Sequence, residues 1–281
     1  MPDCNRCQKA LLHSQSGSAA SAFLRAIPSE PAYQMTPLRL VAALRRRLRW
    51  PIPLAAGQCR GKRCRGVLDT LGDHAASCPK SGLLKLRSKP IERTWARIMR
   101  EAGARVRENF MLRDSGISSI DPADGRRIEV VVTGLPLHSG IPLAIDATLV
   151  SPLDTKGKPH GDADVCPGVA IRASEKDKAR TYHELTDSGM LRLKVAASEI
   201  GGRLNAEGKQ LVRAAAVLRS RDEPALLRSA VFRALHSRWL TMLSVAVQEA
   251  VTATIVDEGV ALLDAADGPA PLSVHMWLEA A

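Results

Sequence analysis

Aromatic residues are scarce in this chain of 281 residues, where Phe, Trp and Tyr together make up 3%. Proteins that bind single-stranded nucleic acid without sequence preference stack its bases on aromatic side chains, so a stacking surface of that kind is not expected. Long hydrophobic runs are lacking as well, because Gln248 and Glu249 interrupt the most apolar late segment, 240–256. No basic N-terminal stretch leads into an apolar one. We therefore predict an intracellular protein with neither a signal peptide nor a membrane span.

Several motifs of nucleotide chemistry are also absent. Neither Tyr33 nor Tyr182 is followed by the x-Asp-Asp of a polymerase palm, and there is no Gly-x4-Gly-Lys-Ser/Thr phosphate loop. His183 begins a His-Glu-Leu stretch, but no second histidine follows at the spacing of a zinc protease. Because the polymerase motif is absent, we predict that the chain does not polymerise nucleic acid by itself.

Positive charge is in excess and unevenly spread. The formal net charge is +11, and residues 59–100 hold eleven Lys or Arg against three acids, whereas residues 251–281 hold five acids and no Lys or Arg. A concentrated basic segment suits a partner with many phosphates, because each contact releases counterions from nucleic acid. A merely well-solvated surface is the alternative interpretation.

An arginine-rich helix is predicted over residues 36–53, where Pro51 closes it. Its apolar residues recur at helical spacing: Leu40, Val41, Leu44 and Leu48. The candidate nucleic-acid contacts are basic residues of this helix and of the cysteine-rich stretch that follows it: Arg45, Arg46, Arg47, Lys62 and Arg63. A surface helix with a charged face is the alternative.

Four potential zinc ligands lie in the pattern Cys59-x4-Cys64-x9-His74-x3-Cys78. Three thiolates and one imidazole make a tetrahedral zinc set, and the intervening residues are long enough to bring the two pairs together. Clustered cysteines in an intracellular protein favour metal over disulfides. Free buried thiols are the alternative.

The middle of the chain alternates between helical and strand patterns. A helix with Pro90 in its first turn carries one apolar stripe made of Ile91, Trp95, Ile98, Met99 and Ala102. That helix ends at Gly103, and three strands are predicted after it, at 105–112, 126–135 and 141–151. A helix at 174–189, which Ser174 opens, and a strand at 191–200 follow. From Asn205 onward the pattern is helical, and its apolar repeat consists of Leu227, Val231, Leu235 and Leu243. This order predicts an α/β fold with helices packed on a mixed sheet.

Two acids occupy positions where strands usually carry apolar residues. Glu129 and Asp146 lie in consecutive Val- and Ile-rich strands, and two such carboxylates can share a divalent cation when both point to one face. That requires residue 129 to lie opposite 146 or an even number away. Lys178 shares a helical stripe with Tyr182 and suits a role beside a metal. The alternative is that the acids pair with Arg126 or Arg127 and that Lys178 reaches solvent.

With these pieces assembled, the chain resembles the C-terminal region of eukaryotic non-LTR retrotransposon polyproteins, downstream of their reverse transcriptase. The stretches that carry the resemblance are "LLHSQSGSAASAFLRAIP", "RLVAALRRRLRWPIP", "LDTLGDHAASC", "ERTWARIMREAGARV", "GRRIEVVVTGLPLHSGIPLAIDATLVSP", "KARTYHEL" and "EIGGR". The resemblance implies a basic helical segment over residues 1–57, a CCHC zinc knuckle over 58–80, a restriction-endonuclease-like core over 81–204, and C-terminal helices with an acidic tail over 205–281.

The resemblance also implies roles for single residues. Glu129 stands where such nucleases usually place the first metal-binding acid, and Asp146 matches the second. The usual lysine two positions further on is Thr148 here, so the resemblance places that role on Lys178. Glu92, in the preceding helix, would be an accessory ligand.

The expected function is that of a metal-dependent DNA endonuclease domain, which nicks target DNA so that reverse transcription is primed from the new 3′ end. The implied cofactors are structural Zn²⁺ and catalytic Mg²⁺ or Mn²⁺. The implied partners are double-stranded DNA, element RNA and a reverse transcriptase in the same or a parent polyprotein, within the nucleus. The alternatives are an inactive zinc-dependent remnant that only binds nucleic acid, and an interaction module whose basic face binds acidic protein.

Overall fold

A computed structural model of the chain describes residues 5–53, 57–59, 61–62, 64–80, 84–186 and 188–264. The helices are α1 (Arg6–Gln15), α2 (Pro37–Leu48), α3 (Asp73–Ser77), α4 (Leu84–Glu101), α5 (Val169–Thr181), α6 (Ala206–Arg221) and α7 (Arg228–Asp264). The strands are β1 (Gly57–Gln58), β2 (Val67–Leu68), β3 (Arg105–Met111), β4 (Arg127–Thr133), β5 (Leu143–Val150) and β6 (Arg192–Glu199). Short 3₁₀ turns connect several of them: η1 (Ala22–Arg25), η2 (Pro31–Tyr33), η3 (Leu112–Ser115), η4 (His138–Gly140) and η5 (His183–Leu185).

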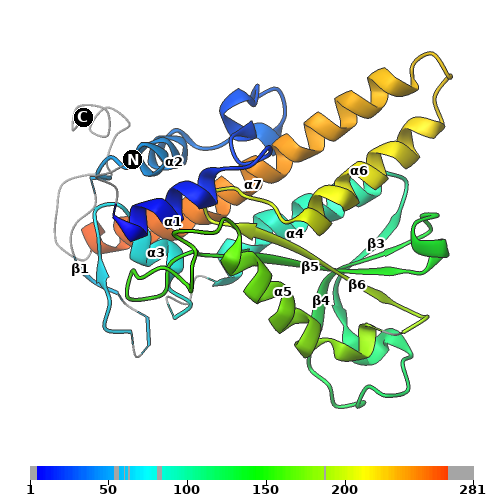
Figure 1. Ribbon diagram of the computed structural model, residues 1–281, viewed down its shortest axis with the longest axis horizontal. Coiled ribbons are helices and arrows are strands. Elements are labelled where there is room, and N and C mark those ends of the chain that lie inside the picture. The colour runs from blue at the N-terminus through cyan, green and yellow to red at the C-terminus, as the bar shows by residue number, and fades with distance from the viewer. Residues whose placement is uncertain are drawn as a thin grey trace.

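The larger sheet is mixed and has the strand order β3-β4-β5-β6. The first three strands pair antiparallel, and β6 runs parallel to β5, as a crossover through α5 requires. Figure 1 shows α5 on one face of this sheet and α4 on the other. Helix α6 packs on β6, and α7 packs against both α4 and α6. The predicted order of helix, three strands, helix and strand is therefore observed, and the fold is mixed α/β.

Helix α4 lines one face of the sheet with the predicted apolar stripe. Ile91, Trp95, Ile98 and Met99 are fully buried, and Ala102 is nearly so. The prediction placed Pro90 in the first turn, but α4 begins at Leu84 and Pro90 lies inside it. A proline there removes one backbone hydrogen bond, and the buried stripe that follows compensates for that loss.

Helix α7 forms the centre of the helical layer. It packs against α4, α6, α2 and α3. Its buried part begins at Trp239, whose Nε1 donates to Glu101 Oε2 of α4 at 2.7 Å. The predicted apolar repeat began at Leu227, but Leu227 precedes the helix and is exposed. By length and hydropathy α7 resembles a membrane span, yet 83% of its most apolar window is buried inside the protein, as in the core helix of a soluble fold.

Helix α2 buries a different face from the predicted one. Leu40 and Leu48 are exposed, whereas Ala42 and Ala43 are buried together with two arginines, Arg45 and Arg46. Thr36 caps the helix by accepting from Arg39 N, and its C-cap Arg49 is left-handed with φ 58°. The arginine-rich side of α2 therefore faces the protein interior.

Helix α5 begins five residues before the predicted Ser174. Its N-cap is Gly168, which takes a left-handed φ of 77° and makes no side-chain capping bond. The helix ends at Thr181, and Tyr182 and Leu185 then turn into the sheet, where both are buried. This keeps Lys178 on the side of α5 that faces β5.

Candidate metal centre and carboxylate site

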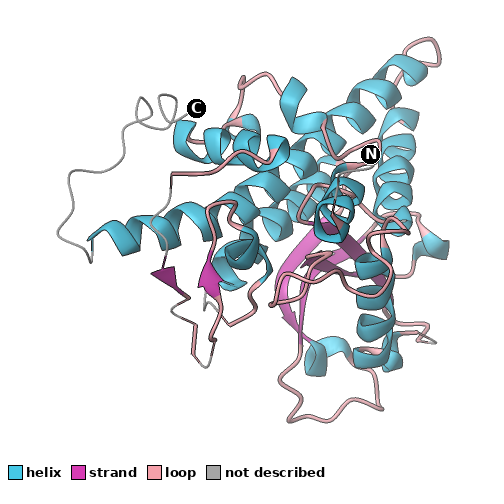
Figure 2. Cartoon of the chain, turned by 60° about the vertical axis from the view of Figure 1, so that its left-hand side comes forward, coloured by secondary structure: helices cyan, strands magenta, loops and turns pink. Residues whose placement is uncertain are grey.

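The cysteine cluster is built on the short β1–β2 ribbon, which Figure 2 shows apart from the larger sheet. Cys59 follows β1, and its amide donates to Gly66 O at 2.9 Å. The amide of Cys64 donates to Gly61 O, also at 2.9 Å, which closes a tight loop between the two cysteines. These two bonds satisfy the backbone amides of Cys59 and Cys64, and both sulfur atoms lie on the same side of the ribbon.

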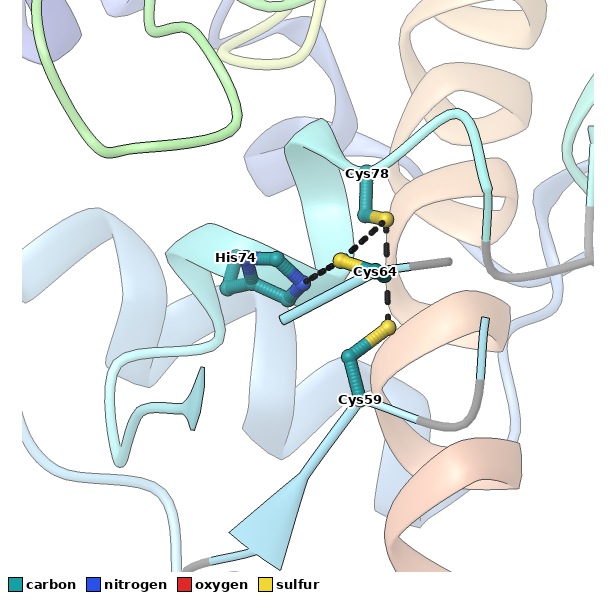
Figure 3. Close-up of side chains that lie close together, drawn as sticks. All are labelled: Cys59, Cys64, His74 and Cys78. Atoms are coloured by element: carbon teal, nitrogen blue, oxygen red, sulfur yellow. Dashed lines mark hydrogen bonds between the residues drawn. The ribbon is translucent and has the colours of Figure 1, made fainter. Parts of the chain in front are cut away.

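The other two ligands come from helix α3. Asp69 accepts hydrogen bonds from the amides of Leu71, Asp73 and His74 at 2.8 to 3.0 Å, which fixes the start of this short helix. His74 lies in its first turn and Cys78 is its C-cap, so both side chains face the ribbon. Figure 3 shows the imidazole of His74 directed at the sulfur of Cys64.

The four ligand atoms have the spacing of a tetrahedral zinc site. Sγ of Cys78 lies 3.8 Å from Sγ of Cys59 and 3.7 Å from Sγ of Cys64, and Cys64 Sγ lies 3.5 Å from His74 Nε2 (Figure 3). With Zn–S bonds of about 2.3 Å and Zn–N bonds of about 2.0 Å, a regular tetrahedron places two sulfurs about 3.8 Å apart and a sulfur and a nitrogen about 3.5 Å apart. The predicted set is brought together and can hold a metal ion such as zinc.

The electrostatics of these thiols also fit a cation. Burial raises the pKa of Cys59 to about 12 and raises that of Cys78 as well. The Gly66 amide donates to Cys64 Sγ at 3.4 Å and lowers the pKa of Cys64. A bound divalent ion favours the thiolate form, so it stabilises charges that burial alone disfavours.

The arginines of α2 support this centre from inside. Arg46 Nη1 donates to Leu71 O at 2.9 Å, and Arg49 forms a bidentate pair with Asp73 at 2.7 and 2.8 Å. Arg45 Nη1 donates to Pro51 O at 2.6 Å. The prediction that Arg45 and Arg46 contact nucleic acid is therefore corrected, because both are buried and bonded within the protein.

The remaining predicted contacts are placed differently. Arg47 is half-buried, donates to Ala20 O at 3.4 Å and stacks over Phe23. Lys62 is exposed beside the cysteine cluster. Arg63 lies outside the described residues.

The second candidate site lies on the face of the sheet that α5 covers. The register pairs Val130 with Ile145 and Val131 with Ala144. Continued by one residue, it puts Glu129 opposite Asp146, so both carboxylates leave the sheet on the same face. The geometric condition set by the sequence is met.

Asp146 is fully buried, and both of its oxygens accept hydrogen bonds. Lys178 Nζ donates to Oδ2 at 2.7 Å, and Thr148 Oγ1 donates to Oδ1. Lys178 also lies 5.8 Å from the centre of the Tyr182 ring. Burial and the charges of Asp146 and Glu129 raise the pKa of Tyr182, whose hydroxyl donates to Arg127 O at 3.0 Å.

Glu129 lacks the partners that Asp146 has. Its Oε2 is buried with no hydrogen-bond partner. Burial, and then the charge of Asp146, raise the pKa of Glu129 to about 8, with a further contribution from Glu92. Glu92 is buried and lies 3.4 Å from Lys89 Nζ. Glu129 therefore has a buried oxygen without a donor, and it lies close enough to Asp146 and Glu92 for their charges to raise its pKa.

The sequence-based alternative of pairing with Arg126 is not observed. Arg126 pairs with Asp124 and Glu184 at 2.6 and 2.5 Å, and its guanidinium carbon lies 5.8 Å from the centre of the Tyr182 ring. Among the described residues, the cysteine–histidine set is the one group of three or more potential ligands whose atoms lie within 4.8 Å of one another. Glu92, Glu129 and Asp146 are less tightly gathered than that set.

One buried cationic side chain, that of Arg87, was not predicted from the sequence. Arg87 lies four residues before Ile91 on the apolar stripe of α4 and is 6% exposed. The signal was available, because 87, 91 and 95 fall on the same side of a helix. A charged residue at that spacing marks either a buried ion pair or a ligand site.

No protein-family model, no curated protein and no solved structure matches this chain. The resemblance to retrotransposon polyproteins therefore stays a prediction that rests on the sequence motifs.

Proposed function

We propose that this protein is a metal-dependent DNA endonuclease domain that nicks double-stranded DNA in the nucleus, so that a reverse transcriptase in the same or a parent polyprotein primes from the new 3′ end. The observation that carries the proposal is the pair of opposed strand carboxylates with Lys178 bonded to one of them. The order α4, β3, β4, β5, α5, β6 supports a restriction-endonuclease-like core.

In this proposal Glu129 and Asp146 hold one Mg²⁺ or Mn²⁺, and Glu92 supports them through charge. When bound, the ion polarises a phosphoryl oxygen and lowers the pKa of its water. Lys178 keeps the Asp146 carboxylate oriented through its 2.7 Å bond and adds positive charge beside the phosphate that reacts. Thr148 fixes the other oxygen of Asp146, in the position where such nucleases usually carry lysine.

Structural zinc on Cys59, Cys64, His74 and Cys78 completes the proposal. The fit of these distances to a tetrahedron supports it. The exposed basic residues near the centre would then contact the duplex, with Lys62 on the surface and Arg65 and Lys80 lining a cavity of about 650 Å³ beside it. Element RNA could use the same basic surface.

The test is nicking of a supercoiled plasmid in Mg²⁺ or Mn²⁺. We expect Asp146→Asn and Lys178→Met each to lose at least about 100-fold in rate, because each removes charge from the reacting centre. Lys176→Met, on the exposed side of the same helix, is the matched control for Lys178 and should nick like the wild type. Equal nicking by all four proteins contradicts the assignment.

A zinc-dependent protein that binds nucleic acid without cleaving it is the second candidate. It is favoured by the saturation of Asp146, whose two oxygens already have protein donors. Salt-dependent duplex binding with no nicking by the wild type in either metal would select this candidate. Absence of salt-dependent binding would leave only an interaction with acidic protein.

A further inference from the structure

A pocket of about 470 Å³ has no role in the function proposed above. It lies between the end of β5, the loop that follows, and the first turns of α5. Its polar lining includes Arg87 from α4, Ser151 and His160 from the loop region, and Ser174 from α5. Ser151 Oγ lies 2.7 Å from Ser77 Oγ and accepts from Leu153 N at 3.0 Å, so the wall is preorganised.

Arg87 is a buried cation, and among the described residues Cys78 of the cysteine cluster is the one group whose negative charge raises its pKa. Its Nη2 donates to Leu149 O at 3.4 Å, which is a long bond and leaves the other guanidinium N–H groups for the pocket. In the described part of the chain no carboxylate forms an ion pair with Arg87. Burying an unpaired charge is costly, so a site of this kind favours an anion.

The acids that line the same pocket are committed elsewhere. Asp154 Oδ1 accepts from the amides of Lys156 and Lys158 at 2.8 and 2.9 Å, inside its own turn. Asp177 is exposed and pairs with Arg180 along α5. Neither carboxylate neutralises Arg87.

We propose that this pocket binds a backbone phosphate of the DNA strand, with Arg87 as the residue that positions it. The inference rests on the proposed endonuclease function, because it takes the phosphate from the same duplex. Leu149 follows Asp146 by three residues on β5, which is about 10 Å of strand. A duplex covers that distance in about three base steps, so both sites can contact one substrate.

The experiment compares the wild type with three variants. Arg87→Met keeps the volume and removes the charge, Ser174→Glu places a carboxylate on the pocket wall, and Arg93→Met removes the same charge from the exposed side of α4. The probes are inorganic phosphate, followed by its effect on Tm, and a short duplex, followed by its Kd at several salt concentrations.

Phosphate should raise the Tm of the wild type and of Arg93→Met, whereas the Tm of Arg87→Met and of Ser174→Glu should not change when phosphate is added. For the duplex we expect the Kd of Arg87→Met and of Ser174→Glu to be at least about 10-fold higher than that of the wild type. The slope of log Kd against log salt concentration should fall by about one in these two variants. Ser174→Glu decides the matter if Arg87→Met does not fold, because Ser174 is only half-buried.

Failure of this inference differs from failure of the proposed function. If Arg87→Met and Ser174→Glu bind the duplex as the wild type does, the pocket assignment is wrong even though the wild type nicks plasmid. If the wild type binds phosphate and duplex through Arg87 but never nicks, the pocket assignment holds and the endonuclease is wrong. If the pocket binds phosphate but the duplex does not compete for it, the assignment to a DNA strand is overturned.

Discussion

Glu199, at the end of β6, is another buried carboxyl group, and its proton should affect stability. It is 1% exposed, its Oε2 has no hydrogen-bond partner, and Arg203 Nε lies 3.7 Å away. Burial raises its pKa to about 7, although the charge of Arg203 opposes that rise. Because the folded protein holds this proton more tightly than the unfolded chain, the free energy of unfolding falls as pH rises through the window from 4.5 to about 7.

Replacing Glu199 with Gln should remove this part of the pH dependence. One extra bound proton changes stability by about 1.4 kcal/mol per pH unit, so between pH 5 and pH 8 the wild type should lose about 1 to 3 kcal/mol more than Glu199→Gln. Urea unfolding of both proteins at the two pH values measures this difference. Other buried acids such as Glu129 are present in both proteins, so their contributions to the pH dependence cancel in the comparison. An equal loss of unfolding free energy in the two proteins would show that Glu199 does not hold its proton.

Single residues were predictable where their chemistry is unusual for their place. Cys59 and His74 were found because thiols and imidazole at such spacing are metal ligands, and Asp146 because a carboxylate interrupts an apolar strand. Arg45 and Arg46 were assigned to nucleic acid because their acceptors are not visible in the sequence: one is a carbonyl on the distant Leu71.

At the scale of elements, the ribbon and α3 depend on one glycine. A Cβ at Gly66 would lie 1.9 Å from Cε1 of His74, so only glycine lets the ribbon and the helix approach closely enough to share a metal. Gly66→Ala must displace the imidazole and with it one ligand.

We expect Gly66→Ala to lower the zinc affinity at least about 10-fold, since loss of ligand orientation typically costs 10–100-fold. Competition with a coloured chelator measures that affinity. Gly125→Ala is the matched control, because a Cβ there has no neighbour within 4 Å and the glycine has no positive φ. Unchanged affinity in Gly66→Ala would contradict the tetrahedral arrangement.

Element order was more predictable than element ends and faces. The strands β3, β4, β5 and β6 were located within two residues because Val and Ile patterns mark them. The start of α5 was missed because Gly168 gives no side-chain capping signal. The register of β4 with β5 depends on the geometry of the connection between them, where Ser139 and Gly140 take positive φ, and sequence alone does not specify that turn.

Over the whole molecule, the cysteine centre belongs to the main hydrophobic core. Cys59, Ala76 and Cys78 pack in the same buried cluster as Trp95 of α4 and Ile255 of α7. Gly72, at the start of α3, approaches Ile255 closely. The same cluster also holds residues of the larger sheet, such as Val130 and Ile145, but α3 packs directly against α7. The metal centre should therefore be coupled more strongly to the far end of α7 than to the strands of the larger sheet.

Removal of zinc by a chelator should reveal this coupling. We expect amide hydrogen exchange to accelerate at least about 100-fold over residues 57–80 and to rise also at the end of α7, because zinc binding supplies the local folding free energy. The amides of β4 and β5 should change little. Exchange that accelerates equally in all elements, or in none, would contradict this division; repletion with zinc is the control.

Helix α7 also has a consequence for the order of events during synthesis. It packs against η1, η2, α2, α3, α4 and α6, all of which leave the ribosome before it. Buried side chains such as Trp95 and Ala42 share its cluster, and they lack that partner until α7 has been translated. The nascent chain therefore exposes this apolar surface for most of its elongation, and chaperone binding should be strongest in that interval.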